Sequence, residues 1–301
     1  MIMRVPWVAC LFVFTLMSLP GCRARTSSVQ AATNPESASA TTQRGTPGTA
    51  VAGLLAAVEG TLGQIYVQVN PSVVNIRTVQ RQTVVFPVVP EMPGYPFPQG
   101  PQEFIRQGSG SGFVWDTLGH IVTNNHVVEG ADRITVTFYD DTIVSAKVVG
   151  TDPESDLAVV KVDVAAELLH PVQLGDSTQV KVGQLAVTIG NPFGLQSTMT
   201  VGIISALGRV LPVDSDDPQE AEYTIPDIIQ TDAPINPGSS GGVLVNEGGL
   251  VIGVTSAIIS PLGVSIGIGF AIPAVIVQKV VPVLIKRRAT SIPGWASVAY
   301  P

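Results

Sequence analysis

Residues 236–244 read NPGSSGGVL, a glycine-rich turn that leads into an apolar, strand-like run. The three glycines permit backbone conformations that bulkier residues cannot adopt, and they let another chain approach the turn closely. A serine on such a turn can present its hydroxyl to a ligand, beside backbone N–H groups that can stabilise an oxyanion. Ser239 and Ser240 are therefore both candidate nucleophiles, although loops without chemistry often have the same composition.

A nucleophilic serine needs a base, and the sequence has three histidines. His126 follows a short apolar run, where a polar side chain can face a cleft, and its position alone leaves a structural and a catalytic role equally open. His120 belongs to a turn-like segment and is expected to be exposed. His170 precedes Pro171 and is expected in a loop between two groups of strands.

The base in turn needs a buried carboxylate to orient it. Asp156 directly precedes the apolar run at 157–162, which makes it a candidate. An aspartate in this place can also simply close a turn. Asp152 and Asp232 compete with it on similar grounds.

The composition predicts a β-rich protein with many turns. Of the 301 residues 45% are hydrophobic and 13% charged, with 30 glycines and 24 prolines. The formal net charge is −7, and no basic stripe is present. Binding to nucleic acid is therefore not expected.

Strand-like runs separated by turns fall into two groups, one on each side of His170. Short strands at this spacing are typical of antiparallel barrels or sandwiches, so two β-domains are predicted, at about 70–165 and 171–275. The segment from Pro87 to Pro101 has six prolines and is predicted to be an irregular loop. The predicted strands are 73–77, 84–89, 112–115, 120–123, 134–138, 143–149 and 157–162, then 179–182, 185–190, 198–207, 227–231, 242–245, 250–257 and 266–271.

Helices are expected at both ends of this region. Apolar residues at helical spacing predict one over 51–69, which Asn70 and Pro71 end. A second helix is predicted over 273–286, where basic residues at its C-terminal end suit the helix dipole.

The N-terminus indicates export. One positive charge precedes the apolar run at 5–19, whose 15 residues are too few for a membrane span of roughly 20 but suit a signal peptide. The run leads into Leu-Pro-Gly-Cys, which resembles a bacterial lipobox and predicts lipidation of Cys22 after cleavage of the signal peptide at 1–22. An ordinary secretory signal and an uncleaved anchor are the alternatives. The polar residues 23–50 are predicted to be a disordered tether.

Three segments in this order resemble the catalytic motifs of the HtrA (Deg-type, DegP-like) trypsin-like serine proteases. They are TNNHVV at 123–128, SDLAV at 155–159 and NPGSSGG at 236–242. Supporting segments resemble the same family and extend the likeness over about 52–286. These are 69–76, 108–113, 189–194, 230–233 and 269–273.

The resemblance implies an all-β, chymotrypsin-like double β-barrel with short N- and C-terminal helices. The protease domain would cover 51–290, followed by a tail at 291–301, with the active site between the barrels. Most members continue into PDZ domains, whereas this sequence stops at Pro301. The family's trimers further imply a homotrimer built through the segment at 51–69, and the alternative is a helix that packs on its own barrel.

The resemblance also implies the site residues. His126 would be the general base, Asp156 its orienting carboxylate and Ser240 the nucleophile. The backbone N–H groups at 238–240, of Gly238, Ser239 and Ser240, would form the oxyanion hole. The family usually has Asn where this sequence has Ser239.

Pro234 and Ile235 would lie at the base of the specificity pocket. Neither is acidic, so a preference for Lys or Arg is not expected. An apolar pocket of loose specificity is expected instead. Loose specificity would suit a serine endopeptidase that degrades unfolded or damaged proteins of the cell envelope. The protease itself would be anchored to a membrane by lipid, or else be secreted or periplasmic. No cofactor or metal is implied.

Two other readings are considered. A non-catalytic relative could bind unfolded chains as a holdase. A lipoprotein with a purely structural β-sandwich would leave all three motifs unexplained.

Overall fold

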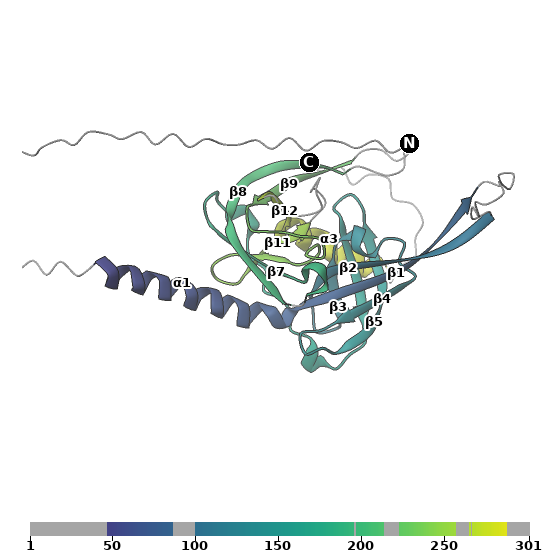
Figure 1. Cartoon of the computed structure of the whole chain (residues 1–301), viewed down its shortest axis with the longest axis horizontal. Helices are drawn as coiled ribbons and strands as arrows, with labels where there is room; N and C mark the ends of the chain where they lie inside the picture. Colours follow the sequence, from purple (N-terminus) through teal and green to yellow (C-terminus); the bar gives the residue numbers. More distant parts are fainter. Residues whose placement is uncertain are drawn as a thin grey trace, which may run out of the picture. The chain divides into compact units, whose positions relative to one another are not determined.

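The computed structural model describes residues 47–86, 100–195, 197–213, 223–256, 265 and 267–287 (Figure 1). The chain divides into two units, Met1–Pro47 and Gly48–Pro301, and the fold described below is that of the second. The predicted signal peptide with Cys22, most of the predicted tether and the tail at 291–301 lie outside the described residues. So does the proline-rich segment, apart from its last two residues, which belong to a strand.

Twelve antiparallel strands form two closed barrels of six strands each. In the first, the strand order is β1-β2-β3-β6-β5-β4, and in the second β10-β11-β12-β9-β8-β7. The prediction of an all-β, chymotrypsin-like double barrel is thus confirmed. The strands are β1 (Val73–Phe86), β2 (Gly100–Val114), β3 (His120–Thr123), β4 (Arg133–Thr137), β5 (Ile143–Asp152), β6 (Leu157–Val162), β7 (Leu185–Gly190), β8 (Thr198–Val213), β9 (Tyr223–Thr231), β10 (Val243–Val245), β11 (Val251–Ser256) and β12 (Gly269–Pro273).

One predicted strand, 179–182, is wrong. The chain there forms a 3-10 turn, η3 (Ser177–Gln179), followed by irregular chain. The Asp176 carboxylate accepts hydrogen bonds from the N–H and the hydroxyl of Thr178, at 2.9 and 2.6 Å. Such local side-chain bonds compete with strand pairing, which explains the difference.

The strands expected at 73–77 and 84–89 belong to one continuous strand, β1, up to Phe86; residues 87–89 lie outside the described residues. It pairs with β2 without a register shift, from Val73 opposite Phe113 to Phe86 opposite Gly100. The distal part of this hairpin projects from the first barrel as a two-stranded ribbon (Figure 1). The residues at 81–83 and 101–109 are exposed and form no buried apolar face, which is why the sequence pattern indicated no strand over 78–83 or 100–111.

The largest apolar cluster is shared by the two barrels and the two long helices. Phe113 and Leu157 come from the first barrel and Ile189 and Val254 from the second, and all four are fully buried. A second cluster fills the first barrel and a third completes the second. Burial of this common core holds the barrels together and thereby fixes the geometry between them.

Helix α1 (Pro47–Val69) begins four residues before the predicted start and contains the end of the predicted tether. Near its C-terminal end, Ile65 and Val69 are buried in the shared core. Nearer its start, Leu54 and Leu55 are exposed. No helix among the described residues is long and apolar enough to cross a membrane.

Helix α3 (Ala274–Arg287) covers both barrels, since it contacts β5 and β6 of the first and β11 and β12 of the second. It buries Val277, Val281 and Leu284. Leu284 lies over Gly150 of β5, where an added Cβ would come within 3.1 Å of the leucine Cβ. The helix therefore needs a glycine below it in order to pack this closely.

We expect Leu284→Ala to lower the free energy of unfolding by about 2–5 kcal/mol, because it opens a cavity under α3. Its neighbour Val283 is 44% exposed, so Val283→Ala should change stability by less than about 1 kcal/mol. Urea denaturation of both variants measures the difference. Equal effects would contradict the role given to α3.

Candidate active site

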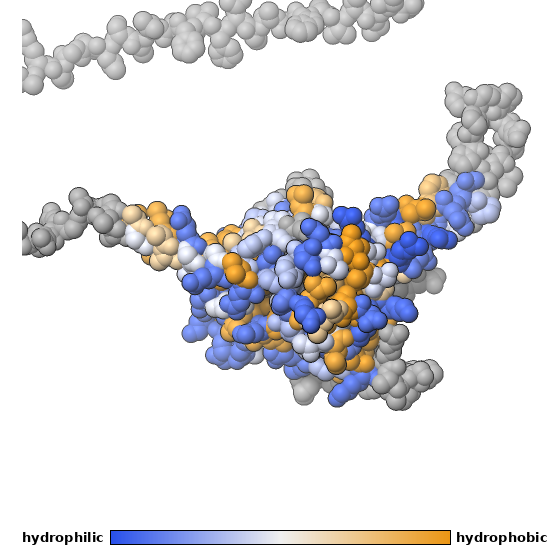
Figure 2. Space-filling model, turned by 90° about the horizontal axis from the view of Figure 1, so that it is seen from below, coloured by the Kyte–Doolittle hydropathy of each residue, from blue (hydrophilic) through white to orange (hydrophobic). Residues whose placement is uncertain are grey.

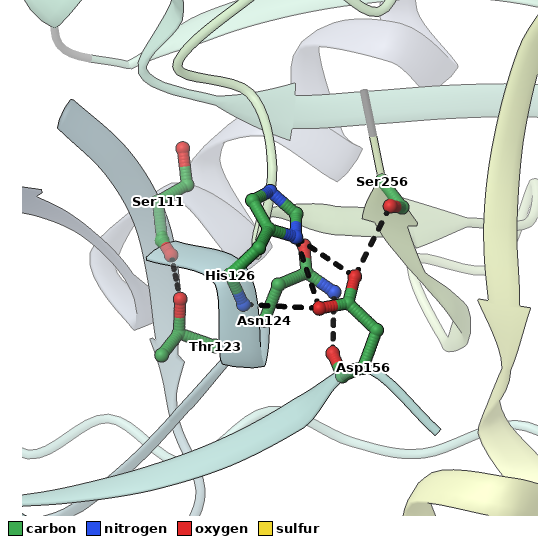
Figure 3. A network of polar contacts seen from close by, with 6 residues as sticks. All are labelled: Ser111, Thr123, Asn124, His126, Asp156 and Ser256. Atoms are coloured by element: carbon green, nitrogen blue, oxygen red, sulfur yellow. Dashed lines mark hydrogen bonds and ion pairs between the residues drawn. The ribbon is translucent and has the colours of Figure 1, made fainter. Parts of the chain in front are cut away.

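A histidine and a buried aspartate meet at the end of the first barrel. His126 lies on the one-turn helix α2 (Asn125–Val128), which directly follows β3. Its Nδ1 lies 2.9 Å from both carboxylate oxygens of Asp156 (Figure 3). The aspartate side chain is 2% exposed and the histidine side chain 36%. The carboxylate is thus shielded while the imidazole reaches the surface of a cleft.

Several bonds fix Asp156, whose backbone has the unusual φ of 52°. Its carbonyl oxygen accepts from the N–H of Asn125 at 3.1 Å and from Nδ2 of Asn124 at 2.9 Å. Its Oδ1 accepts the backbone N–H of His126 at 3.1 Å, and its Oδ2 accepts the hydroxyl of Ser256 at 3.3 Å (Figure 3). The carboxylate therefore has one orientation, which in turn orients the imidazole.

The other two histidines have local partners. His120 is half-buried rather than exposed as predicted, because Asp116 folds over it: Oδ2 lies 2.6 Å from Nδ1, and Oδ1 accepts the backbone N–H of His120. His170 is exposed, with its ring edge against Tyr139.

The competing aspartates also have local partners. Asp152 accepts the hydroxyl of Ser155 at 2.6 Å, and Asp232 accepts the N–H of Ile203 at 2.7 Å. Of the three candidate carboxylates, Asp156 is the one with a hydrogen bond to a histidine.

The serine turn is tied to the second barrel through Thr255 of β11. Ser239 donates its N–H to Asn236 at 2.8 Å, and its carbonyl accepts from Gly242 N–H at 2.9 Å and from Thr255 Oγ1 at 2.6 Å. Gly241 donates to the Thr255 carbonyl at 2.9 Å. Because the Ser239 N–H is bonded inside the turn, the N–H groups of Gly238 and Ser240 remain as candidate oxyanion donors among the three that were predicted.

Ser111 of β2 ties the same turn to the first barrel. Its N–H donates to the Ser240 carbonyl and its Oγ donates to the Gly238 carbonyl, both at 2.7 Å. Its Oγ also accepts the N–H of Asn191 at 2.8 Å, and its carbonyl accepts the hydroxyl of Thr123 at 2.7 Å (Figure 3). The peptides on both sides of the serine pair are therefore positioned by a residue of the other barrel.

Phe193 positions the peptide before Gly238. It lies in the 3-10 turn η4 (Pro192–Gly194) with φ 54°, and its N–H donates to the Pro237 carbonyl at 2.9 Å. In a planar trans peptide the next N–H points the opposite way. The Gly238 N–H is thus directed away from Phe193, and Gly238 itself lines the cleft.

The loop that presents Phe193 is itself anchored to the first barrel and to α1. Asn191 Nδ2 donates to the Val74 carbonyl of β1 at 2.8 Å, and its Oδ1 accepts the Ser197 N–H at 3.0 Å. The Ser197 carbonyl accepts the hydroxyl of Tyr66 from α1 at 3.1 Å. The orientation of the Pro237 peptide therefore depends on elements from across the fold.

A cleft of about 490 Å³ contains both His126 and Ser240 in its wall. Pro234 and Ile235 do not line it: the Pro234 carbonyl accepts from Thr200 Oγ1, and Ile235 is buried against Gly269. Their role in a specificity pocket remains a prediction. In the described part of the chain, no group of three or more His, Cys, Asp or Glu residues could hold a metal ion. The cleft is lined by Thr78, Gln80, Arg106, Gly108, Ser109, His126, Val127, Glu129, Pro237, Gly238 and Ser240.

The residues that position these groups had no role predicted from the sequence. Ser111 and Asn191 lie within segments that supported the family resemblance, but their partners are 80 and 127 residues away along the chain. Ser256 bonds to an aspartate 100 residues away. Only the fold brings such pairs together, so local sequence patterns could not indicate them.

The trypsin-like class is defined by two six-stranded barrels with a histidine, an aspartate and a serine turn at their contact. Similarity to known proteins supports the same class. The sequence profile of the trypsin-like peptidase domain family matches residues 110–254. Protease Do-like 1 from the chloroplast of Arabidopsis thaliana is 48% identical over 182 residues, which are 60% of this chain and 40% of that protein. A probable periplasmic serine endoprotease, DegP-like, from Pseudomonas putida strain W619 is 39% identical over 250 residues, 77% of this chain and 50% of that protein.

Among solved structures, the HtrA-type protease AlgW with a decapeptide has a TM-score of 0.59 and 39% identity, covering 74% of this chain and 67% of that one. The chain belongs to the HtrA-type family of trypsin-like serine proteases. It spans half the length or less of these two curated relatives.

Gly241 tests the close contact between the barrels. Its φ is 84°, and an added Cβ would overlap the Ser111 carbonyl oxygen and Thr123 Oγ1. Gly183 is a matched control, because its φ of 91° gives the same backbone strain while no atom lies within 4 Å of the added Cβ. We expect Gly183→Ala to cost about 1–2 kcal/mol of folding free energy, and Gly241→Ala about 3 kcal/mol more. Urea denaturation compares them, and similar losses would contradict this contact.

Proposed function

We propose that the protein is a serine endopeptidase in which His126, Asp156 and Ser240 form the catalytic triad. The observation that carries this proposal is the hydrogen bond between His126 Nδ1 and the buried carboxylate of Asp156. The same histidine lines one cleft together with Ser240. Family membership supports the same chemistry.

The roles follow from the protonation that this geometry favours. Asp156 accepts the Nδ1–H of His126, so the other ring nitrogen, Nε2, carries the lone pair that acts as base. Ser240 Oγ attacks the peptide carbonyl while Nε2 takes its proton. The imidazolium, stabilised by Asp156, then protonates the leaving amine, and water hydrolyses the acyl-enzyme by the same steps.

The N–H groups of Gly238 and Ser240 are proposed to stabilise the tetrahedral oxyanion. The bond from Phe193 to the Pro237 carbonyl supports this role, because it directs the Gly238 N–H away from Phe193 at a residue that lines the cleft. One such donor typically contributes about 10²–10³ in rate. Ser239 would shape the turn from its buried position rather than donate.

Substrates are proposed to be unfolded or damaged proteins of the cell envelope. Relatives named periplasmic endoproteases support an extracytoplasmic location. Pro234 and Ile235, which do not line the cleft described above, are proposed to set a loose preference for small apolar side chains from the base of a specificity pocket. The lipobox-like segment before Cys22 supports attachment to a membrane by lipid, which mass analysis of the mature N-terminus would test.

A homotrimer built through α1 is also proposed. The first part of α1 supports it, because Leu54 and Leu55 are 66% and 57% exposed there. Exposed apolar side chains gathered on one element mark an interaction surface. The C-terminal part of the same helix packs on its own barrels through Ile65 and Val69. The first part of α1 therefore supports a trimer contact, and the last part supports the alternative of packing within the chain.

We expect the double change Leu54→Lys, Leu55→Lys to lower the mass in solution from trimer to monomer. The control Gln64→Lys adds charge at an exposed polar position of the same helix and should leave the mass unchanged. Light scattering after size-exclusion chromatography measures both. A wild-type monomer, or a trimer that survives the double change, would contradict the proposal.

The two serines give the test of the activity itself. Ser240→Ala should lose labelling by a fluorophosphonate probe and lower casein hydrolysis by more than about 10³-fold. The Ser239 hydroxyl has no hydrogen bond within the described residues, so Ser239→Ala should slow labelling by less than about tenfold. The opposite order would place the nucleophile one residue earlier. A wild-type protein that neither labels nor cleaves but binds unfolded casein would favour the holdase alternative.

A further inference from the structure

Thr255 of β11 contacts the serine turn with three polar groups. Its N–H donates to the Gly242 carbonyl and its carbonyl accepts the N–H of Gly241, both at 2.9 Å. Its hydroxyl donates to the Ser239 carbonyl at 2.6 Å. The mechanism proposed above gives this residue no role, although all three of its partners lie within two residues of Ser240 along the chain.

The hydroxyl of Thr255 is buried. Hydrophilic residues cover much of the face drawn in Figure 2, whereas Thr255 is 1% exposed. A hydroxyl in such a place is costly unless it has a hydrogen-bond partner, and the structure gives it the Ser239 carbonyl. Branching at Cβ restricts the side chain of threonine to few rotamers. The hydroxyl therefore has a fixed direction, and its bond fixes the carbonyl in turn.

Gly242 leaves the space in which this bond forms. A Cβ added there would lie 3.0 Å from the Ser239 carbonyl oxygen and 3.1 Å from Thr255 Oγ1. It would also lie 2.7 Å from the Ile189 carbonyl oxygen. All three distances are shorter than the carbon–oxygen contacts of about 3.3–3.6 Å that proteins ordinarily make. A side chain at this position would therefore separate the hydroxyl from the carbonyl.

The Ser239 carbonyl belongs to the same peptide as the Ser240 N–H. In a planar trans peptide these two groups point in opposite directions. The carbonyl accepts from Thr255 Oγ1 and from the N–H of Gly242. The Ser240 N–H is thus directed away from both donors, and Ser240 itself lines the cleft.

We propose that Thr255 is a positioning residue whose hydroxyl sets the direction of the Ser240 N–H as an oxyanion donor. The inference rests on the proposed protease function and adds to it a residue outside the triad. The two proposed donors are then held in the same manner by two different elements. The N–H of Phe193 directs the donor at Gly238, and the hydroxyl of Thr255 directs the donor at Ser240.

Two substitutions of Thr255 give the first test. Thr255→Val replaces the hydroxyl with a methyl group, which cannot approach the carbonyl oxygen to 2.6 Å and therefore turns the peptide. We expect kcat/KM for a peptide substrate to fall about 10- to 100-fold, since loss of a whole donor costs about 10²–10³. Thr255→Ser keeps the hydroxyl and should stay close to wild type. Equal values for the two variants would overturn the inference.

The loss in Thr255→Val should appear in kcat and not in KM, because the oxyanion forms in the transition state and not in the bound substrate. A peptide aldehyde gives an independent measure, since its adduct with Ser240 places an oxygen where the oxyanion forms. Its affinity should fall by the same factor as kcat/KM, while that of the matching peptide alcohol, which forms no adduct, should be unchanged. A rise in KM alone, or equal losses for aldehyde and alcohol, would overturn the inference. Absence of Ser240-dependent cleavage by the wild type would overturn the proposed function instead.

Thr231 separates this role from a loss of stability. It is fully buried in the second barrel, and its hydroxyl donates to the Ile203 carbonyl at 2.8 Å and accepts the N–H of Ala233 at 3.1 Å. Thr231→Val should lower the urea midpoint as Thr255→Val does, while kcat stays at the wild-type value. If Thr255→Val does not fold, Thr255→Ala removes the same hydroxyl without crowding the carbonyl, and the same loss of kcat is expected. An equal loss of kcat in Thr231→Val would overturn the inference, because kcat would then follow the stability of the barrel.

Discussion

Ser111 uses all of its polar groups at the contact between the two barrels. Its N–H and hydroxyl hold the carbonyls of Ser240 and Gly238, and its own carbonyl and hydroxyl oxygens accept from Thr123 and Asn191. The histidine and aspartate belong to one barrel and the serine turn to the other. Their relative position therefore depends on these hydrogen bonds of Ser111, which form the junction between the barrels. It also depends on the shared apolar core and on α3, which packs on both barrels.

The proposed oxyanion donors, the N–H groups of Gly238 and Ser240, depend on the same junction. Asn191 binds both Ser111 and β1, and its loop presents the Phe193 N–H to the Pro237 carbonyl. Because Tyr66 of α1 binds this loop at Ser197, the helix proposed to build the trimer also reaches the oxyanion turn. In the proposed trimer, a few hydrogen bonds would thus connect the assembly helix α1 to the proposed active site.

Much of this could be predicted from the sequence, because barrel strands carry short apolar runs and glycine turns that are visible locally. The fold class and most strands of the second barrel were predicted on this basis. In the distal ribbon of β1 and β2, the strand at 84–89 was predicted, but the rest was not, because the residues at 81–83 and 101–109 are exposed and have no apolar period. His126, Asp156 and Ser240 were expected as the site from motifs. The bonds made by Ser111, Asn191 and Ser256 join distant segments and needed the structure, as did the finding that the Ser239 N–H is engaged within its own turn.

A crystal structure of the protein after reaction with a fluorophosphonate would test the central claim most directly. We expect phosphorus on Ser240 Oγ and the phosphonyl oxygen about 2.7–3.1 Å from the nitrogens of Gly238 and Ser240. The Phe193 bond to the Pro237 carbonyl and the four bonds of Ser111 should be unchanged. A phosphonyl oxygen that points to solvent, with the peptide between Pro237 and Gly238 turned over, would contradict the account of how the junction positions the site.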